Sequence, residues 1–138
     1  MVEAIDAGHN QYCRTFGAPP LIDQIAKRYG PKLNRDIDPV REILVSTGAN
    51  TVIGSIISAL VNQGDELVLF EPTFPMYIDH LQMSGGNLKT VPLEVDDNGN
   101  WNFKPEMLRN ALSNKTKLLI LNTPHNPTGK CFTLEEQL

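Results

Sequence analysis

The sequence has little basic charge, no long apolar run and few cysteines. Its 12 Lys and Arg residues stand against 16 Asp and Glu, which gives a formal net charge of −4. Nucleic-acid binders carry a basic stripe and membrane-surface helices are rich in Lys and Arg, so we expect neither kind of partner. Because no run of about 18 apolar residues occurs, the sequence encodes no membrane-spanning helix.

Cysteine and histidine are equally sparse. Cys13 and Cys131 are too few for a disulfide framework, and they favour a reducing compartment, with cytoplasm and mitochondrion both open. His9 and His80 have no partners at metal-ligand spacing, so no metal site is expected.

The length of 138 residues fits one ordinary domain, but the C-terminal end is unusual. The segment Thr133–Glu136 has the pattern of a capping box, which opens a helix. The chain stops at Leu138, about two turns too early for a stable helix. We therefore expect a fragment of a longer protein; a small complete protein with a frayed tail is the alternative.

Apolar periodicity alternates along the chain between helix and strand patterns. Helical spacing predicts helices near 2–9, 19–29, 52–61, 74–84 and 105–112. Strands are predicted at 42–47, 66–70, 88–95 and 117–121, and the second and fourth are continuously apolar, as in strands buried on both faces. This order predicts an α/β fold with a mainly parallel sheet and helices on both faces. Residues 1–40 are expected to form an N-terminal helical segment and connector, and residues 41–138 the larger unit.

Ligands bind parallel sheets beyond the carboxyl ends of the strands, which singles out three segments: 46–50, 71–77 and 122–129. Ser46–Asn50 precedes a long helix, whose N-terminal amides could hold a phosphate; simple turn chemistry is the alternative. Phe74 could stack on a flat ring, or it could be a core aromatic. Asn126 begins an Asn-Pro-Thr-Gly turn and could donate to a ligand oxygen, or the turn could be an ordinary one.

Together these segments resemble the class I/II aminotransferases, the pyridoxal-phosphate enzymes of fold type I. The match is closest to the kynurenine aminotransferase, cysteine-conjugate β-lyase and glutamine transaminase K group. The resemblance covers nearly the whole chain and rests on four stretches: NQYCRTFGAPPL (10–21), VSTGAN (45–50), NQGDELVLFEPTFPMY (62–77) and LNTPHNPTGKCF (121–132).

The resemblance implies that pyridoxal 5′-phosphate is the cofactor and that residues 41–138 are part of the domain that binds it. Gly48, Ala49 and Asn50 would hold the phosphate, and Phe74 would stack on the pyridine ring. It further implies that Asn126 would donate to the ring hydroxyl oxygen. In a homodimer, Tyr12 would reach the phosphate in the neighbouring subunit, and the stretch 17–20 would lie near the substrate entrance.

The same resemblance implies a transaminase that moves an amino group from an aromatic, sulfur-containing or glutamine-like amino acid to a 2-oxo acid. Kynurenine enzymes have an aromatic residue where this chain has Asn50, so glutamine, methionine and phenylalanine are equally open as donors. The Schiff-base lysine, the acid at the pyridine nitrogen and the carboxylate-binding arginine would all lie beyond Leu138, and Lys130 is not expected to replace that lysine. A β-lyase and a non-catalytic binding module remain the alternatives.

Overall fold

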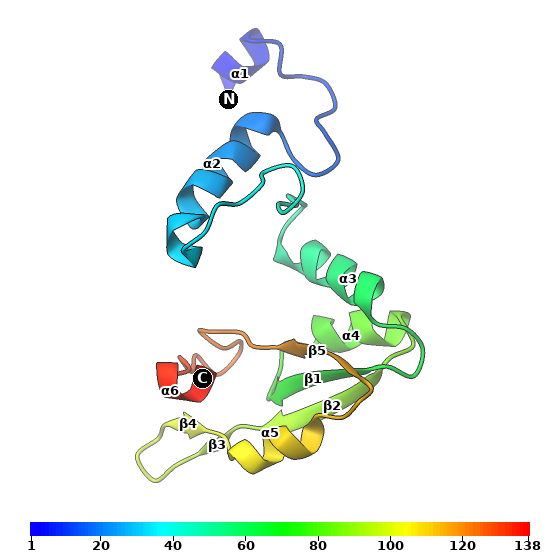
Figure 1. Cartoon of the computed structure of the whole chain (residues 1–138), viewed down its shortest axis with the longest axis vertical. Coiled ribbons are helices and arrows are strands. Elements are labelled where there is room, and N and C mark those ends of the chain that lie inside the picture. The colour runs from blue at the N-terminus through cyan, green and yellow to red at the C-terminus, as the bar shows by residue number, and fades with distance from the viewer. The chain divides into compact units, whose positions relative to one another are not determined.

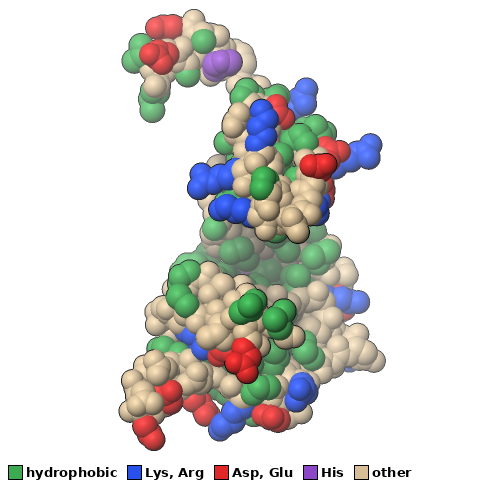
Figure 2. All heavy atoms as spheres, turned by 60° about the vertical axis from the view of Figure 1, so that its left-hand side comes forward, with side chains coloured by type: hydrophobic (Ala, Val, Ile, Leu, Met, Phe, Trp, Pro, Cys, Tyr) green, Lys and Arg blue, Asp and Glu red, His purple; other side chains and the backbone are tan.

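The structure, a computed structural model, describes all residues from Met1 to Leu138 (Figure 1). They form two compact units, Met1–Val52 and Ile53–Leu138, which are described in turn. No helix in the chain is both long and apolar enough to cross a membrane. On the face drawn in Figure 2, acidic and basic side chains are interspersed.

The first unit is helical. It contains α1 (Val2–Asp6), α2 (Pro19–Tyr29) and a short 3-10 helix, η1 (Pro31–Leu33). Helix α2 begins at Pro19, where a missing N–H costs nothing, and its last turn carries Lys27 and Arg28, which complement the helix dipole. This helix confirms the sequence prediction for 19–29, whereas α1 is shorter than predicted.

The predicted strand at 42–47 is wrong. The amide of Val45 donates to the Phe16 carbonyl at 2.9 Å, but the segment joins no ladder. A strand is stabilised by pairing with a neighbour, and this unit contains no other strand with which 42–47 could pair. The β-branched residues alone therefore do not produce one.

Helix α3 (Ala49–Leu60) confirms the predicted apolar helix and continues into the second unit. There a parallel sheet has the order β2-β1-β5, formed by β1 (Glu66–Glu71), β2 (Asn87–Pro92) and β5 (Thr116–Ile120). A small antiparallel pair joins β3 (Glu94–Val95) to β4 (Trp101–Asn102). The helices are α4 (Met76–Met83), α5 (Pro105–Ala111) and α6 (Leu134–Gln137).

The central strand β1 separates two apolar clusters. On one face, Leu67 and Leu69 pack with residues of α3 and α4, among them Ile57 and Leu81. On the other face, Val68 and Phe70 pack with residues that include Val91, Leu93 and Phe132, and side chains of α5 adjoin them. Figure 1 shows α4 and α5 on opposite sides of the sheet. The predicted α/β layering and parallel pairing are therefore confirmed.

Two predicted strands differ in detail. The run 88–95 is split, because β1 ends at Glu71 and the chain beyond Leu93 pairs with β4 instead. Strand β5 alternates between half-buried and exposed residues and is not buried on both faces. It lies at the edge of the sheet and pairs with β1 alone, so its continuous apolar sequence is not matched by continuous burial.

Candidate functional site

The turn before α3 contains a glycine in a left-handed conformation. Gly48 adopts a φ of 92°, in the left-handed region that favours glycine, and a Cβ there would meet nothing within 4 Å. Ala49 is the first residue of the 12-residue helix. The first turn of an α-helix directs amide groups and a partial positive charge outward, while the Gly48 amide just before it donates to the Ser46 carbonyl at 2.9 Å. All three residues are exposed.

In the second unit, two candidate residues follow neighbouring parallel strands. Phe74 comes after β1, and Asn126 comes after β5. Because carboxyl ends of parallel strands share one edge of the sheet, both residues lie beyond that edge. Phe74 is half-buried and packs edge-on against Tyr77, with ring centroids 5.7 Å apart, while Asn126 is exposed.

The turn 125–130 that presents Asn126 is closed by its own hydrogen bonds. The His125 amide donates to the Lys130 carbonyl, and the Gly129 amide donates to the His125 carbonyl, both at 2.7 Å. Within the turn, His125 Nδ1 lies 2.9 Å from Thr128 Oγ1, which also accepts from the Lys130 amide at 3.2 Å. These bonds join both ends of the turn to its middle.

His125 anchors one end of this turn in the core. Its ring is buried and meets the Phe132 ring edge-on at 6.3 Å. Burial lowers the pKa of His125, and a hydrogen bond with the Phe70 backbone opposes this only in part. The imidazole of His125 is therefore an internal group whose pKa lies below its ordinary value.

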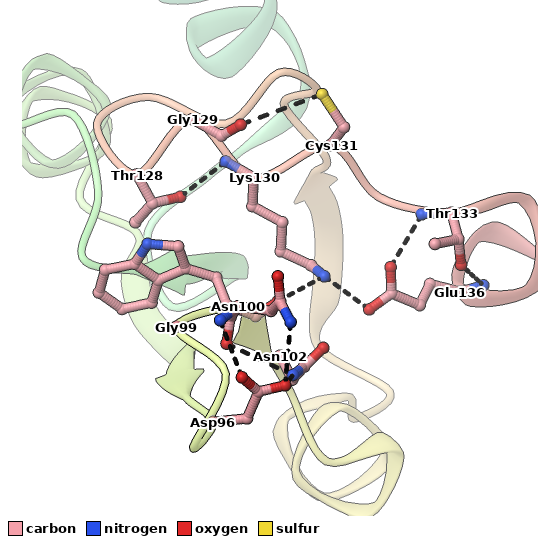
Figure 3. Close-up of a pocket in the computed structure, with 11 residues that line it drawn as sticks. Asp96, Gly99, Asn100, Asn102, Thr128, Gly129, Lys130, Cys131, Thr133 and Glu136 are labelled. Carbon is pink, nitrogen blue, oxygen red and sulfur yellow. Dashed lines mark hydrogen bonds and ion pairs between the residues drawn. The ribbon is translucent and has the colours of Figure 1, made fainter.

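Lys130 anchors the other end. Its side chain is only 7 % exposed, and Nζ lies 2.7 Å from both the Trp101 carbonyl and Glu136 Oε1 (Figure 3). Nζ also lies 5.0 Å from the centroid of the Phe132 ring. The capping box predicted at Thr133–Glu136 is confirmed, so Glu136 holds Lys130 and the start of α6 at once. Burial alone would raise the pKa of Glu136, but Lys130 and the Thr133 amide outweigh it and lower the pKa.

A cavity of about 680 Å³ adjoins this network (Figure 3). Thr128, Gly129 and Lys130 from the turn line one part of it, and residues of the β3–β4 hairpin line another. Asp96 in the hairpin is fully engaged: its carboxylate accepts from the amides of Asn98 and Asn100 and from the Asn102 side chain. These bonds lower the pKa of Asp96, with the Asn100 amide as the largest cause.

Tyr12 lies in the first unit with its side chain fully exposed. Cys13 and Cys131 are both free thiols. No group of three or more His, Cys, Asp or Glu side chains is arranged to hold a metal ion.

Sequence reasoning missed the network around Lys130. Glu136 was found as part of a local capping pattern, but the Trp101 carbonyl lies 29 residues from Lys130, and no local signal connects them. The lysine's apolar neighbour Phe132 was the only hint that its side chain turns inward.

Comparison with known proteins identifies the family. Residues 3–137 match the family described as aminotransferase class I and II. Kynurenine–oxoglutarate transaminase 1 of Homo sapiens is 40% identical over 135 residues, which cover 92% of this chain and 32% of the relative. Kynurenine–oxoglutarate transaminase of Dictyostelium discoideum is 37% identical over 149 residues, covering 99% of this chain and 34% of the relative.

Solved structures of aminotransferases are also similar to this chain. N-succinyldiaminopimelate aminotransferase from Mycobacterium tuberculosis superposes with a TM-score of 0.90 at 36% identity, over 98% of this chain and 35% of that one. A methionine aminotransferase from Escherichia coli gives a TM-score of 0.90 at 30% identity, over 98% of this chain and 35% of that one. The chain thus belongs to the aminotransferase class I and II family, and it spans about a third of the length of these relatives. The family generally depends on pyridoxal phosphate, acts on amino and oxo acids and forms dimers.

Proposed function

We propose that this chain is the cofactor-holding part of a pyridoxal-phosphate transaminase. The whole protein would transfer an amino group from an aromatic, sulfur-containing or glutamine-like amino acid to a 2-oxo acid. The observation that carries the proposal is the 40% identity to human kynurenine–oxoglutarate transaminase 1 across 92% of the chain. In this proposal residues 41–138 belong to the cofactor-binding domain and residues 1–40 form the helical segment before it.

Each candidate residue has one task in binding the cofactor. The Gly48–Asn50 stretch holds the phosphate at the start of α3, supported by the left-handed φ of Gly48, which lets the backbone turn into the helix there. The Phe74 ring lies over the pyridine ring, and the Asn126 side-chain amide donates to the ring oxygen. Tyr12 contributes to the phosphate site of a second subunit, and its full exposure leaves the hydroxyl accessible for that contact. When bound, the cofactor supplies an electron sink for reactions at the amino-acid Cα.

Lys130 does not fit the role of the lysine that forms a Schiff base with the cofactor. Such a lysine must present a free, deprotonated amine. The Nζ atom of Lys130 is instead held by the Glu136 carboxylate at 2.7 Å and by the Trp101 carbonyl at 2.7 Å, and its side chain is buried. We therefore expect cofactor binding by this chain to be non-covalent, and we expect the 138 residues alone to show no transamination.

The test is a titration of the ¹⁵N-labelled chain with 4′-deoxypyridoxine 5′-phosphate, followed by two-dimensional NMR. This analogue keeps the ring and the phosphate but has no aldehyde, so it cannot form imines with solvated lysines. We expect saturable shifts in the amides of 48–50 and in the resonances of Phe74 and Asn126. Inorganic phosphate should shift only the amide resonances of residues 48–50.

Asn126→Ala is the matched variant. Because it removes one hydrogen bond to a charged oxygen, it should weaken the analogue about tenfold while leaving phosphate binding unchanged. A dispersed spectrum without saturable shifts at these residues would contradict the proposal. If the chain alone gives a poorly dispersed spectrum, the same residues are tested by replacing the matching third of the human relative with this chain and measuring its cofactor content.

A further inference from the structure

We propose that Lys130 is a positioning residue that holds the Asn126–Gly129 turn in place through Glu136 and the Trp101 carbonyl. The inference rests on the proposed function, because it assigns Lys130 to the orientation of Asn126 toward the cofactor ring. It goes beyond that function by giving a task to a lysine that binds neither cofactor nor substrate.

The backbone of Lys130 is hydrogen-bonded to two residues of the turn. The Lys130 carbonyl accepts the His125 amide at 2.7 Å, and its own amide donates to Thr128 Oγ1 at 3.2 Å. Any displacement of the Lys130 backbone therefore moves both ends of the loop that carries Asn126. Asn126 itself is exposed, and neither its side chain nor its backbone makes a hydrogen bond within the turn.

The Lys130 side chain is held in place by three neighbours. Its ammonium is shared between the Trp101 carbonyl in β4 and Glu136 Oε1, both at 2.7 Å, and it faces the Phe132 ring. Glu136 in turn accepts the Thr133 amide at 2.8 Å through Oε2 and donates its own amide to Thr133 Oγ1 at 3.2 Å. A single buried charge thus links the turn, the β3–β4 hairpin and the first turn of α6, as Figure 3 shows.

The chain offers a matched control ion pair. Lys104 and Glu94 form an ion pair of 3.1 Å at the base of the same hairpin, but their side chains are 68% and 60% exposed. Exposed pairs contribute little, whereas removing one partner of a buried pair leaves a charge without compensation. Lys130→Met should therefore reduce the order of the turn at residues 126–129, and Lys104→Met should leave that order unchanged.

The experiment has a ligand-free arm and a ligand arm. In the first, ¹⁵N relaxation is measured at residues 126–129 in the wild-type chain and in Lys130→Met, Lys130→Met/Glu136→Gln and Lys104→Met. We expect the order parameters of the turn to fall in both Lys130 variants and to stay unchanged in Lys104→Met. The double variant removes the unpaired carboxylate, so a loss of order that persists there is due to the missing anchor and not to a buried charge.

In the ligand arm, the affinity for 4′-deoxypyridoxine 5′-phosphate is measured in a double-mutant cycle. Lys130→Met should weaken binding about fivefold in the wild-type background and have no effect in Asn126→Ala, because a positioning residue acts only through the group it positions. Equal losses in both backgrounds would overturn the proposal, since they indicate a general structural role. Unchanged order in the turn would overturn it as well. If the wild-type chain bound no analogue, the proposed function would fail, while the relaxation data would still decide whether Lys130 orders the turn.

Discussion

Of the three histidines, only His125 is buried, and this gives the folded chain a specific response to pH. Burial lowers its pKa below the ordinary 6.5, so the unfolded chain binds a proton at a pH where the folded chain does not. Because the unfolded state then binds more protons than the folded state, the free energy of unfolding falls as the pH is lowered through about 6.5. The loss ends once the pH drops below the pKa of the folded state.

We expect urea unfolding curves between pH 7.5 and 5 to show this loss, with a slope of up to about 1.4 kcal/mol per pH unit. His125→Gln should flatten the slope, and His9→Gln should leave it unchanged because His9 is exposed. Equal slopes in the wild type and His125→Gln would show that the imidazole is not protected from protonation.

At this scale the sequence could propose the candidate site residues, but not the contacts that support them. Gly48, Phe74 and Asn126 were predicted because each follows an apolar run and ligands bind at strand ends in parallel sheets, although the run before Gly48 forms no strand. For Lys130 the sequence predicted only that it would not replace the Schiff-base lysine. Its partner is a backbone carbonyl in another hairpin, and a carbonyl leaves no trace in the residue type of Trp101.

At the scale of elements, the two apolar strands β1 and β5 differ far more than their sequences suggest. Both were predicted to be buried on both faces. Strand β1 is buried at five of its six residues, whereas β5 alternates because it forms the edge of the sheet. Strand order depends on long-range pairing. Hydrophobicity therefore predicted that β1 and β5 are strands, but not which of the two lies at the centre of the sheet. For the same reason, residues 42–47 have strand-like composition without a partner.

Two leucines, one on each strand, test this difference in burial. Leu69 in β1 is 1% exposed, and Leu119 in β5 is 42% exposed. Leu69→Ala should lower the free energy of unfolding by about 2–5 kcal/mol, because it leaves a cavity between α3, α4 and the sheet. Leu119→Ala should cost about 1 kcal/mol or less. Urea denaturation monitored by Trp101 fluorescence measures both, and similar losses would mean that β5 is as buried as its sequence suggested.

At the scale of the whole molecule, the apolar core is unevenly divided. Both apolar clusters lie in the second unit, while Ile22 is the only large apolar side chain that the first unit buries. Hydrophobic burial is the main favourable term in folding, so each unit's stability should follow its own core. Small cores leave domains marginal, and we expect the chain to be only marginally stable overall.

This division predicts that the chain unfolds in two stages. The single Trp, Trp101, packs against the second cluster and reports only on Ile53–Leu138, whereas amide signals from α2 report on Met1–Val52. With increasing urea, the α2 amides should lose their native NMR signals before Trp101 fluorescence changes. Ile22→Ala should shift only the α2 transition to lower urea, and Leu69→Ala only the Trp101 transition. Coincident transitions in all three proteins would contradict this prediction, because they would show that the chain unfolds in a single cooperative step.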